Sequence, residues 1–596
     1  MSAQPASPPQ TLVDEEKRDY TPSKATSDDG TLVTEKSRGV VQMERLTSRL
    51  TTPYRTVLYI SFALLAYIMS LDQYTNGSYL SAATSYSFAA HSTLTTISSL
   101  KSVFQAVSQP PVAKIGDVAG RLEAYSLCLF LYVIGYIVVA SAPSIYAYAA
   151  GAAINVLGIT GLFLLQNIII ADLSSLRNRL FWSIFPSLPG TINVWVSGNI
   201  TQDFLGKRQE NNHMWRWGIG MFCILTPALA IPVMLSLGIG MRKVKNEEGK
   251  TAVVPRRSDG SRRSIWDQMV AIFWQLDLIG LLLLVGGFGM VLTIITIANG
   301  KGSHWSDPHS IALLTVGGVL IIAFVCWETF GARHPLLSFG LLKNRTVICC
   351  FALALLHPVA SGVIGSYFYT YMLVAADETT LSATRIRNIS SFTATWTAAA
   401  MGIVARYIRR LKPIIIIGFC IELLAFGLMV RYRSAGAKQG DLAGVQVLRG
   451  FGAGCLGFPI QAAIQSVSKR EHLGAITSSY LLIYYLAGGI GSAVGGGIWS
   501  NLVPGKMEAY LPNSTIAGQA YSNPLGLIAT HPPGDPIRDA MSRAHGETQR
   551  ILSITACAIA AVGLVVACFL QNVKLTDEVT LEEVEKADDG KLASTR

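Results

Sequence analysis

The segment that decides the fold is Lys114-Ile-Gly-Asp-Val-Ala-Gly-Arg-Leu-Glu-Ala-Tyr125, a short charged stretch between two long apolar runs. Its two glycines allow the ends of two helices to approach each other closely. The charges of Lys114, Asp117 and Arg121 can pair with one another across those helix ends. These features predict a tight turn between two transmembrane helices, on the cytoplasmic side of a membrane.

The composition indicates a membrane protein. Of the 596 residues, 51% are hydrophobic and 14% are charged, and the mean hydropathy is +0.40. Soluble proteins carry about a quarter charged residues, so we expect the chain to cross a membrane many times. Fourteen apolar runs come near the roughly 20 residues that span a bilayer. They cover residues 56–75, 93–113, 124–141, 147–170, 180–200, 215–240, 274–298, 310–330, 347–375, 388–405, 413–430, 442–465, 476–500 and 551–571.

The distribution of Lys and Arg predicts the orientation, because cytoplasmic loops carry an excess of these residues. With the N-terminus inside, most of the Lys and Arg in the loops lie on the inner side, so we expect both termini to be cytoplasmic. The formal net charge of +11 then faces anionic lipid of the inner leaflet. No nucleic-acid partner is expected.

A basic stretch divides the membrane region. Residues 241–266 contain eight Lys and Arg and few apolar side chains, which is typical of a linker between two halves. The expected parts are a disordered cytoplasmic tail at 1–54, a six-helix bundle at 55–240, a basic cytoplasmic linker at 241–273, two extra helices at 274–330, a second six-helix bundle at 331–571 and a cytoplasmic tail at 572–596. A long outer loop is expected at 501–550, and its residues 536–550 are predicted to form a polar helix that runs into the last span.

The opening segment resembles the loop signature of the major facilitator superfamily, at Gly116, Asp117, Gly120 and Arg121. This resemblance implies an all-α polytopic membrane protein with the major facilitator fold, in which the segment is a gating loop. The expected architecture is therefore two six-helix bundles plus two extra helices, with fourteen transmembrane helices in all.

Three segments resemble the fungal siderophore–iron transporters, a fourteen-span branch of that superfamily. They run from Tyr79 to Ile97, from Gly488 to Pro512 and from Gly534 to Arg550. The resemblance implies import of a ferric siderophore complex of the hydroxamate type by proton symport. It further implies a monomer in the lipid bilayer of the plasma membrane, with no cofactor and no enzymatic activity.

Other functions stay open. They are a proton-coupled drug or toxin exporter, a glutathione–proton exchanger and, from a different class, a ligand-sensing transceptor. The last outer segment favours the importer, and no phosphate-binding Gly-rich loop indicates ATP-driven transport. The chain departs from its relatives at His545, where the family commonly has Tyr, and at Asn155, where major facilitators commonly have Arg.

Two carboxylates are candidates for carrying the coupled protons. An ionisable group inside a bilayer costs about 2.5–3.5 kcal/mol on insertion scales and is functional by default. Asp72 lies near the outer end of the first run, where the alternative is that it faces the lipid headgroups. Glu422 lies in the middle of the eleventh run, where the alternative is a structural partnership with Arg449.

The substrate-binding candidates are aromatic, amide and guanidinium side chains. A ferric hydroxamate already surrounds its iron with oxygen, so a carrier needs flat apolar surfaces and hydrogen bonds and no metal ligands of its own. These candidates are Tyr74, Tyr367, Tyr371, Arg449, Gln461, Tyr480 and Tyr484. A second set is expected to capture ligand from the outer loop and comprises Tyr510, Arg538, His545, Gln549 and Arg550. The nine His residues form no metal-binding spacing, so no metal site is expected.

Overall fold

The computed structural model of the chain describes residues 52–118, 120–173, 185–206, 214–248, 273–274, 277–297, 304–332, 344–467, 473–511 and 513–572. Three parts of the expected domains lie outside the described residues. These are positions 1–51 of the N-terminal tail, 249–272 of the basic linker and 573–596 of the C-terminal tail.

Among the described residues, eleven helical segments are long and apolar enough to cross a membrane. They are built from α2 (Thr52–Ala82), α4 (Arg121–Ser141), α5 (Ile145–Leu173), α8 (Met214–Gly220) with α9 (Phe222–Glu248), α11 (Leu278–Ile297), α12 (Pro308–Cys326), α13 (Arg345–Gly365) with α14 (Phe368–Ala375), α16 (Lys412–Tyr432), α17 (Gln439–Gly454) with α18 (Gly457–Ser466), α19 (Leu473–Tyr510) and α22 (Pro536–Phe569). Each segment coincides with one of the expected apolar runs.

Three further helices coincide with the other expected runs. They are α3 (Leu94–Val118), α7 (Leu188–Thr201) and α15 (Thr380–Ile408). Helix α3 packs against α5, α11 and α19, and α15 packs against α7 and α17. Because neighbouring helices cover them, these helices tolerate more polar residues than helices that face lipid on most sides.

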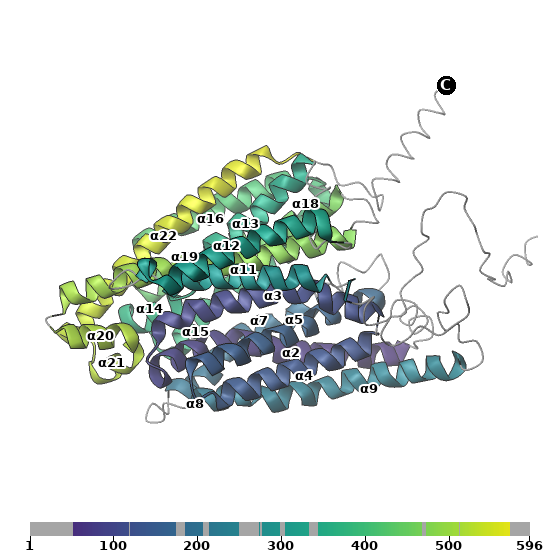
Figure 1. Ribbon diagram of the computed structural model, residues 1–596, viewed down its shortest axis with the longest axis horizontal. Coiled ribbons are helices and arrows are strands. Elements are labelled where there is room, and N and C mark those ends of the chain that lie inside the picture. Colours follow the sequence, from purple (N-terminus) through teal and green to yellow (C-terminus); the bar gives the residue numbers. More distant parts are fainter. Residues whose placement is uncertain are drawn as a thin grey trace, which may run out of the picture. The chain divides into compact units, whose positions relative to one another are not determined.

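The helices form two groups that meet along α3 with α19 and along α7 with α15. Helices α2 to α9, the N-terminal half, pack on one another, and so do α13 to α22, the C-terminal half. The extra pair α11 and α12 pack together, and α11 also contacts both α3 and α19 (Figure 1). The pair therefore lies against the junction between the halves.

The opening segment forms the predicted tight turn. Helix α3 ends at Val118, and Gly120 has a φ of 126°, a conformation that favours glycine. Helix α4 then begins at Arg121, which is buried and whose guanidinium approaches Gly116. The side chain of Asp117 lies outside the described residues.

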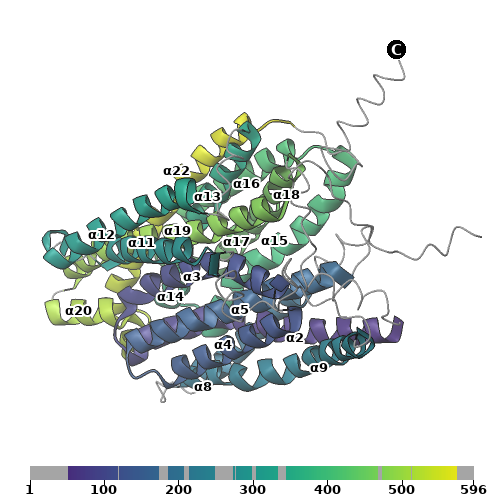
Figure 2. The ribbon, with the colours of Figure 1, turned by 45° about the vertical axis from the view of Figure 1, so that its right-hand side comes forward.

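The expected extent of the outer loop, residues 501–550, is wrong. Helix α19 continues to Tyr510 and α22 begins at Pro536, so the connection is much shorter and contains α20 (Ser514–Ser522) and α21 (Pro524–Thr530). The predicted helix at 536–550 is confirmed, because α22 begins at Pro536 and continues through these residues. Asp535 caps its N-terminus by accepting a hydrogen bond from the Ile537 amide at 2.8 Å. Helices α20 and α21 lie at one end of the bundle, near α14 and the turn between α2 and α3 (Figures 1 and 2).

Backbone contact between α4 and α5 depends on two glycines. A Cβ at Gly135 would overlap the backbone of Asn155, and a Cβ at Gly158 would overlap the backbone of Tyr132. Small residues allow such close helix approach in membranes. Asn155, at the position where an Arg is common in major facilitators, donates from Nδ2 to the carbonyl oxygen of Tyr132 at 3.1 Å. This bond holds the part of α4 that carries Tyr132.

We predict that Gly158→Leu separates α4 from α5 and destabilises the protein by about 1–3 kcal/mol or more, as overpacking does. The measurement is the melting temperature of detergent-solubilised protein, followed by size-exclusion chromatography. Gly427→Leu is the matched control, since a Cβ at Gly427 of α16 meets nothing within 4 Å. Equal melting temperatures for the two variants would contradict the proposed contact.

Candidate functional site

The carboxylate of Asp72 is enclosed in the N-terminal half. Its side chain is 1% exposed. Its Oδ2 accepts a hydrogen bond from the Tyr132 hydroxyl at 2.9 Å, and its Oδ1 accepts one from the Tyr136 hydroxyl. The two tyrosines are four residues apart and therefore share a face of α4. The alternative that Asp72 faces the lipid headgroups is therefore wrong, because protein surrounds it.

The hydrogen bonds extend from Asp72 towards the second half. Asn76 donates from Nδ2 to the Tyr136 hydroxyl at 2.9 Å, and Lys101 of α3 donates to Asn76 Oδ1 at 2.6 Å. On the other side, Thr226 of α9 donates to the Tyr132 hydroxyl at 3.2 Å. We call this chain of side chains the Asp72 network; its members are Asp72, Asn76, Lys101, Tyr132, Tyr136 and Thr226.

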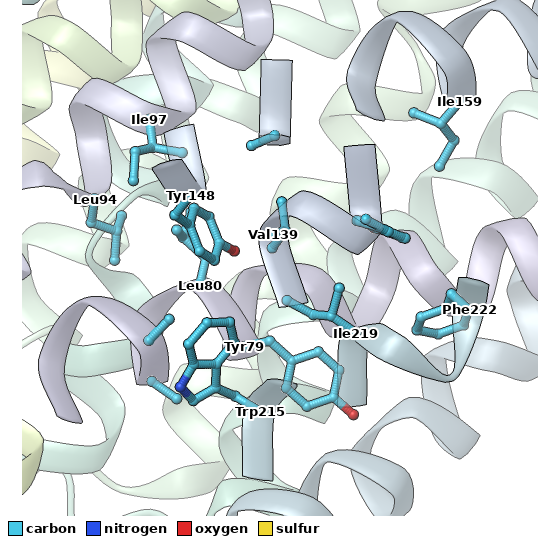
Figure 3. Close-up of a cluster of buried hydrophobic side chains, with 14 of the residues drawn as sticks. Tyr79, Leu80, Leu94, Ile97, Val139, Tyr148, Ile159, Trp215, Ile219 and Phe222 are labelled. Atoms are coloured by element: carbon cyan, nitrogen blue, oxygen red, sulfur yellow. The ribbon is translucent and has the colours of Figure 1, made fainter. Parts of the chain in front are cut away.

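Packed rings and aliphatic side chains surround the network. Tyr136 lies 6.4 Å from Phe222, and Tyr148 lies 5.7 Å from Trp215, between ring centroids. Figure 3 shows Tyr148, Trp215 and Phe222 in one cluster with Tyr79, Leu80, Leu94, Ile97, Val139, Ile159 and Ile219. Such packing leaves little room for water, so the carboxylate depends on protein donors.

The C-terminal half holds a second enclosed carboxylate. Glu422 of α16 is fully buried, and its Oε2 lies 3.0 Å from Nδ1 of His357 on α13. Arg449 of α17 lies within electrostatic range of Glu422 and donates to Ser390 of α15 at 3.4 Å. Within the described residues, Glu422 Oε1 has no hydrogen-bond partner. The sequence-based pairing of Glu422 with Arg449 thus gains His357 as a third member.

Three of the predicted aromatic and amide candidates lie near this carboxylate or on the helices beside it. The ring of Tyr484 lies 6.3 Å from that of His357 and 6.1 Å from that of Tyr480. Tyr480 donates to the carbonyl oxygen of Gly457 at 2.9 Å, which ties α19 to α18. Gln461 lies half-buried on α18. The structure therefore brings Tyr480 and Tyr484 close to His357, the neighbour of Glu422.

The remaining substrate candidates have structural partners. The backbone carbonyl of Tyr74 accepts from Asn388 of α15 at 3.1 Å. The hydroxyl of Tyr371 donates to the Ser434 carbonyl at 2.7 Å, and that of Tyr367 donates to the Ser92 carbonyl at 3.1 Å. Tyr74 and Tyr367 each contact the opposite half of the protein, so both lie at the junction.

Two of the outer-loop capture candidates are fully buried. His545 and Gln549 are buried on α22, because that helix turns the face they share toward the core. His545 lies 4.9 Å from Trp499, which stacks on Tyr367 at 4.2 Å. Gln549 accepts from Arg433 at 3.0 Å.

The other three outer candidates differ in exposure. Arg538 is almost buried and pairs with Asp377, while it also donates to the Leu373 carbonyl at 3.1 Å. Tyr510 donates to Glu547 at 2.9 Å. Arg550 is exposed. Arg538 thus fastens the start of α22 to the end of α14, which is a structural task.

Hydroxyl groups line the junction between the halves. Ser78 of α2 pairs with Thr384 of α15 at 3.3 Å, and Ser81 pairs with Thr370 of α14 at 2.8 Å. Ser99 of α3 donates to the Gly489 carbonyl of α19 at 3.0 Å. Hydrogen bonds between transmembrane helices are worth only about 0.6–2 kcal/mol each, so no single one of these bonds holds the halves together.

Sequence reasoning missed Lys101, Tyr132, Tyr136 and His357. A signal existed for two of them, because Lys101 and His357 are ionisable residues in the middle of expected spans. The two tyrosines had only their four-residue spacing. Tyrosine is common in apolar helices, so that spacing alone does not indicate a carboxylate partner.

No protein-family model matches the chain. Siderophore iron transporter 1 of Saccharomyces cerevisiae is 33% identical over 89% of this chain and 83% of its own length. The MFS siderochrome iron transporter C of Aspergillus fumigatus is 31% identical over 96% of this chain and 93% of its own length.

The chain belongs to the fungal siderophore iron transporters of the major facilitator superfamily. The chain is therefore a multi-pass membrane carrier and not an enzyme. The low affinity heme transporter str3 of Schizosaccharomyces pombe is also similar, with 29% identity over 91% of this chain and 86% of its own length.

A solved structure agrees on the fold. A POT family transporter in complex with 5-aminolevulinic acid superposes with a TM-score of 0.52 at 14% sequence identity, over 86% of this chain and 96% of that one. At this identity the likeness concerns the fold alone. The likeness confirms the all-α polytopic architecture of this chain.

We predict that His357→Ala destabilises the protein by about 1–3 kcal/mol, because it leaves a buried carboxylate without its hydrogen-bond partner. The double variant His357→Ala with Glu422→Gln should recover part of that loss, since it removes the buried charge as well. Thermal unfolding in detergent measures both effects. His309→Ala, at an exposed position of α12, is the control. An absence of recovery in the double variant would contradict the pairing.

Proposed function

We propose that this protein imports a ferric siderophore complex of the hydroxamate type by proton symport. One observation carries the proposal: an enclosed carboxylate, Asp72, is linked by hydrogen bonds through Tyr136 and Asn76 to Lys101 at the junction between the halves. A carboxylate in such a position is suited to bind and release a proton as the halves move. The names of the curated relatives support the cargo.

Protonation changes what Asp72 does in its network. The carboxylate accepts two hydrogen bonds from tyrosines, whereas a protonated carboxyl group is itself a donor. One of the two tyrosine hydroxyls must then reorient. Because Tyr136 also accepts from Asn76, this change reaches Lys101 and the junction. In alternating access, loading of the proton would thereby favour one arrangement of the halves over the other.

Glu422 is the second coupling candidate. Asp72 accepts its direct hydrogen bonds from tyrosine hydroxyls, whereas Glu422 contacts His357; each carboxylate also has one cation within electrostatic range, Lys101 or Arg449. A hydroxyl group can donate to a carboxylate and can accept from a protonated carboxyl group, so the direct contacts of Asp72 suit both states of the acid. We therefore assign coupling to Asp72 and an electrostatic, structural contribution to Glu422.

The cargo itself would supply the ligands of the iron. Within the described residues no group of three or more His, Cys, Asp or Glu side chains could hold a metal ion. The half-buried tyrosines Tyr484 and Tyr485 offer ring surfaces that suit a bulky organic complex. We further propose a monomer in the lipid bilayer of the plasma membrane, with both termini in the cytoplasm, as the excess of Lys and Arg in the inner loops indicates.

Uptake of radiolabelled iron tests the proposal, in yeast cells that lack their own siderophore carriers. We expect accumulation from at least one ferric hydroxamate, faster at acidic than at neutral external pH, and abolished by a protonophore. Haem and glutathione serve as competing cargoes. Export of a dye without uptake of any siderophore would overturn the proposal in favour of an exporter, and binding without net uptake would favour a transceptor.

We predict that Asp72→Asn abolishes uphill accumulation but leaves surface expression and cargo exchange across the membrane intact, because asparagine keeps the shape and cannot carry a proton. Iron uptake and counterflow are measured in the same cells. Asp539→Asn, at an exposed position of α22, is the control. Unchanged accumulation in the Asp72 variant, with loss in Glu422→Gln, would move the coupling role to Glu422.

A further inference from the structure

Arg387 of α15 crosses the junction between the halves. Its guanidinium lies against α2, so that a Cβ at Gly77 would overlap it. The neighbouring residues on α15 fasten this part of the helix to α2, with Thr384 paired to Ser78 at 3.3 Å and Asn388 donating to the Tyr74 carbonyl at 3.1 Å. The position of Arg387 is therefore set by its helix and not by a carboxylate.

The guanidinium of Arg387 has the Tyr369 hydroxyl within electrostatic range. Within the part of the chain that the structure describes, it makes neither a hydrogen bond nor an ion pair. Arg385, two residues earlier, differs because it donates to Asn199 at 3.2 Å and to the Trp195 carbonyl at 3.4 Å. Arg433 likewise donates to Gln549 and to the Ile364 carbonyl. These two arginines serve the packing of helices, while Arg387 has its donors available.

A second cation lies close by. Lys101 is within electrostatic range of both Arg387 and Asp72. Its amine donates to Asn76, and both oxygens of Asp72 are occupied by tyrosine hydroxyls. Lys101 thus has one carboxylate and one further cation within electrostatic range. An excess of buried positive charge is unfavourable unless an anion compensates it.

We propose that Arg387 and Lys101 bind an anionic oxygen group of the cargo, a carboxylate above all, at the junction of the two halves. Arginine suits this task because its planar donors match the two oxygens of a carboxylate. One cation comes from each half, so a bound anion would draw the halves together at a place where carriers of this architecture bind their substrates. The assignment rests on the proposed import of a siderophore complex and adds a charge preference to it.

The test uses two ferric trihydroxamates that differ only in one group, a free carboxylate or the corresponding primary amide. We expect the unmodified protein to take up the carboxylate with a KM about tenfold lower than that for the amide. Arg387→Gln should raise the KM for the carboxylate to that for the amide and leave uptake of the amide unchanged. Arg387→Lys should keep part of the preference, and Arg385→Gln, the matched control on the same helix, should keep all of it.

A second variant moves the guanidinium without changing its charge. Gly77→Ala places a methyl group where the guanidinium lies, and it should reduce the carboxylate preference as Arg387→Gln does. Gly365→Ala is its control, since a Cβ there meets nothing within 4 Å. Surface expression is measured for every variant, so that loss of folding is seen separately from loss of preference.

Two outcomes distinguish this assignment from the transport function on which it rests. Equal KM values for the carboxylate and the amide in the unmodified protein would overturn the anion site and leave the importer in place. The same holds if Arg387→Gln and Gly77→Ala both keep the preference. Uptake of neither complex by a protein that reaches the cell surface would overturn the importer, and the anion site with it.

Discussion

A carboxylate enclosed among transmembrane helices must receive its hydrogen bonds from neighbouring side chains, because no bulk water reaches it. Asp72 receives them from Tyr132 and Tyr136, and the place of these rings depends on how α4 packs. The glycine contacts between α4 and α5, together with the bond from Asn155 to the Tyr132 carbonyl, hold α4 at that place. The packing of α4 against α5 therefore determines whether the carboxylate of Asp72 receives its hydrogen bonds.

Each half buries one carboxylate, and different kinds of side chain surround the two. The N-terminal half surrounds its carboxylate with hydroxyl groups, whereas the C-terminal half places His357 and Arg449 near Glu422. Hydroxyl groups can bond either protonation state of an acid, because they can both donate and accept. The difference gives the halves separate tasks under the proposed mechanism, with proton exchange on one side and electrostatic support on the other.

Polar side chains of several kinds join the two halves. They include the pairs Ser78–Thr384 and Ser81–Thr370, the bond from Ser99 to the Gly489 carbonyl, and the bonds from Arg385 and Asn388 to α7 and α2. The pair α11 and α12 lies against this junction. At the end where α20 and α21 lie, Arg538 pairs with Asp377, and the ring of Trp499 lies against those of Tyr367 and His545; these contacts all lie within the C-terminal half. A contact that crosses to the N-terminal half there is the hydrogen bond from the Tyr367 hydroxyl to the Ser92 carbonyl.

Much of the fold could be predicted from the sequence, because the length of an apolar run and the bias of Lys and Arg depend on the bilayer and not on neighbouring helices. The helical runs, the turn at Gly120 and the polar start of α22 all follow from such local patterns.

The site was predicted only in part. Asp72 and Glu422 could be singled out because an isolated charge in an apolar run is costly, but their partners come from helices distant in the sequence. Hydropathy likewise could not show that His545 and Gln549 point inward, since both are polar and burial depends on which face of α22 meets α13 and α19. The sequence by itself thus determined which residues cross the membrane and which charges needed an explanation. Only the tertiary structure decided which side chains satisfy those charges and left the guanidinium of Arg387 without a hydrogen bond or ion pair among the described residues, because both depend on how separate helices pack.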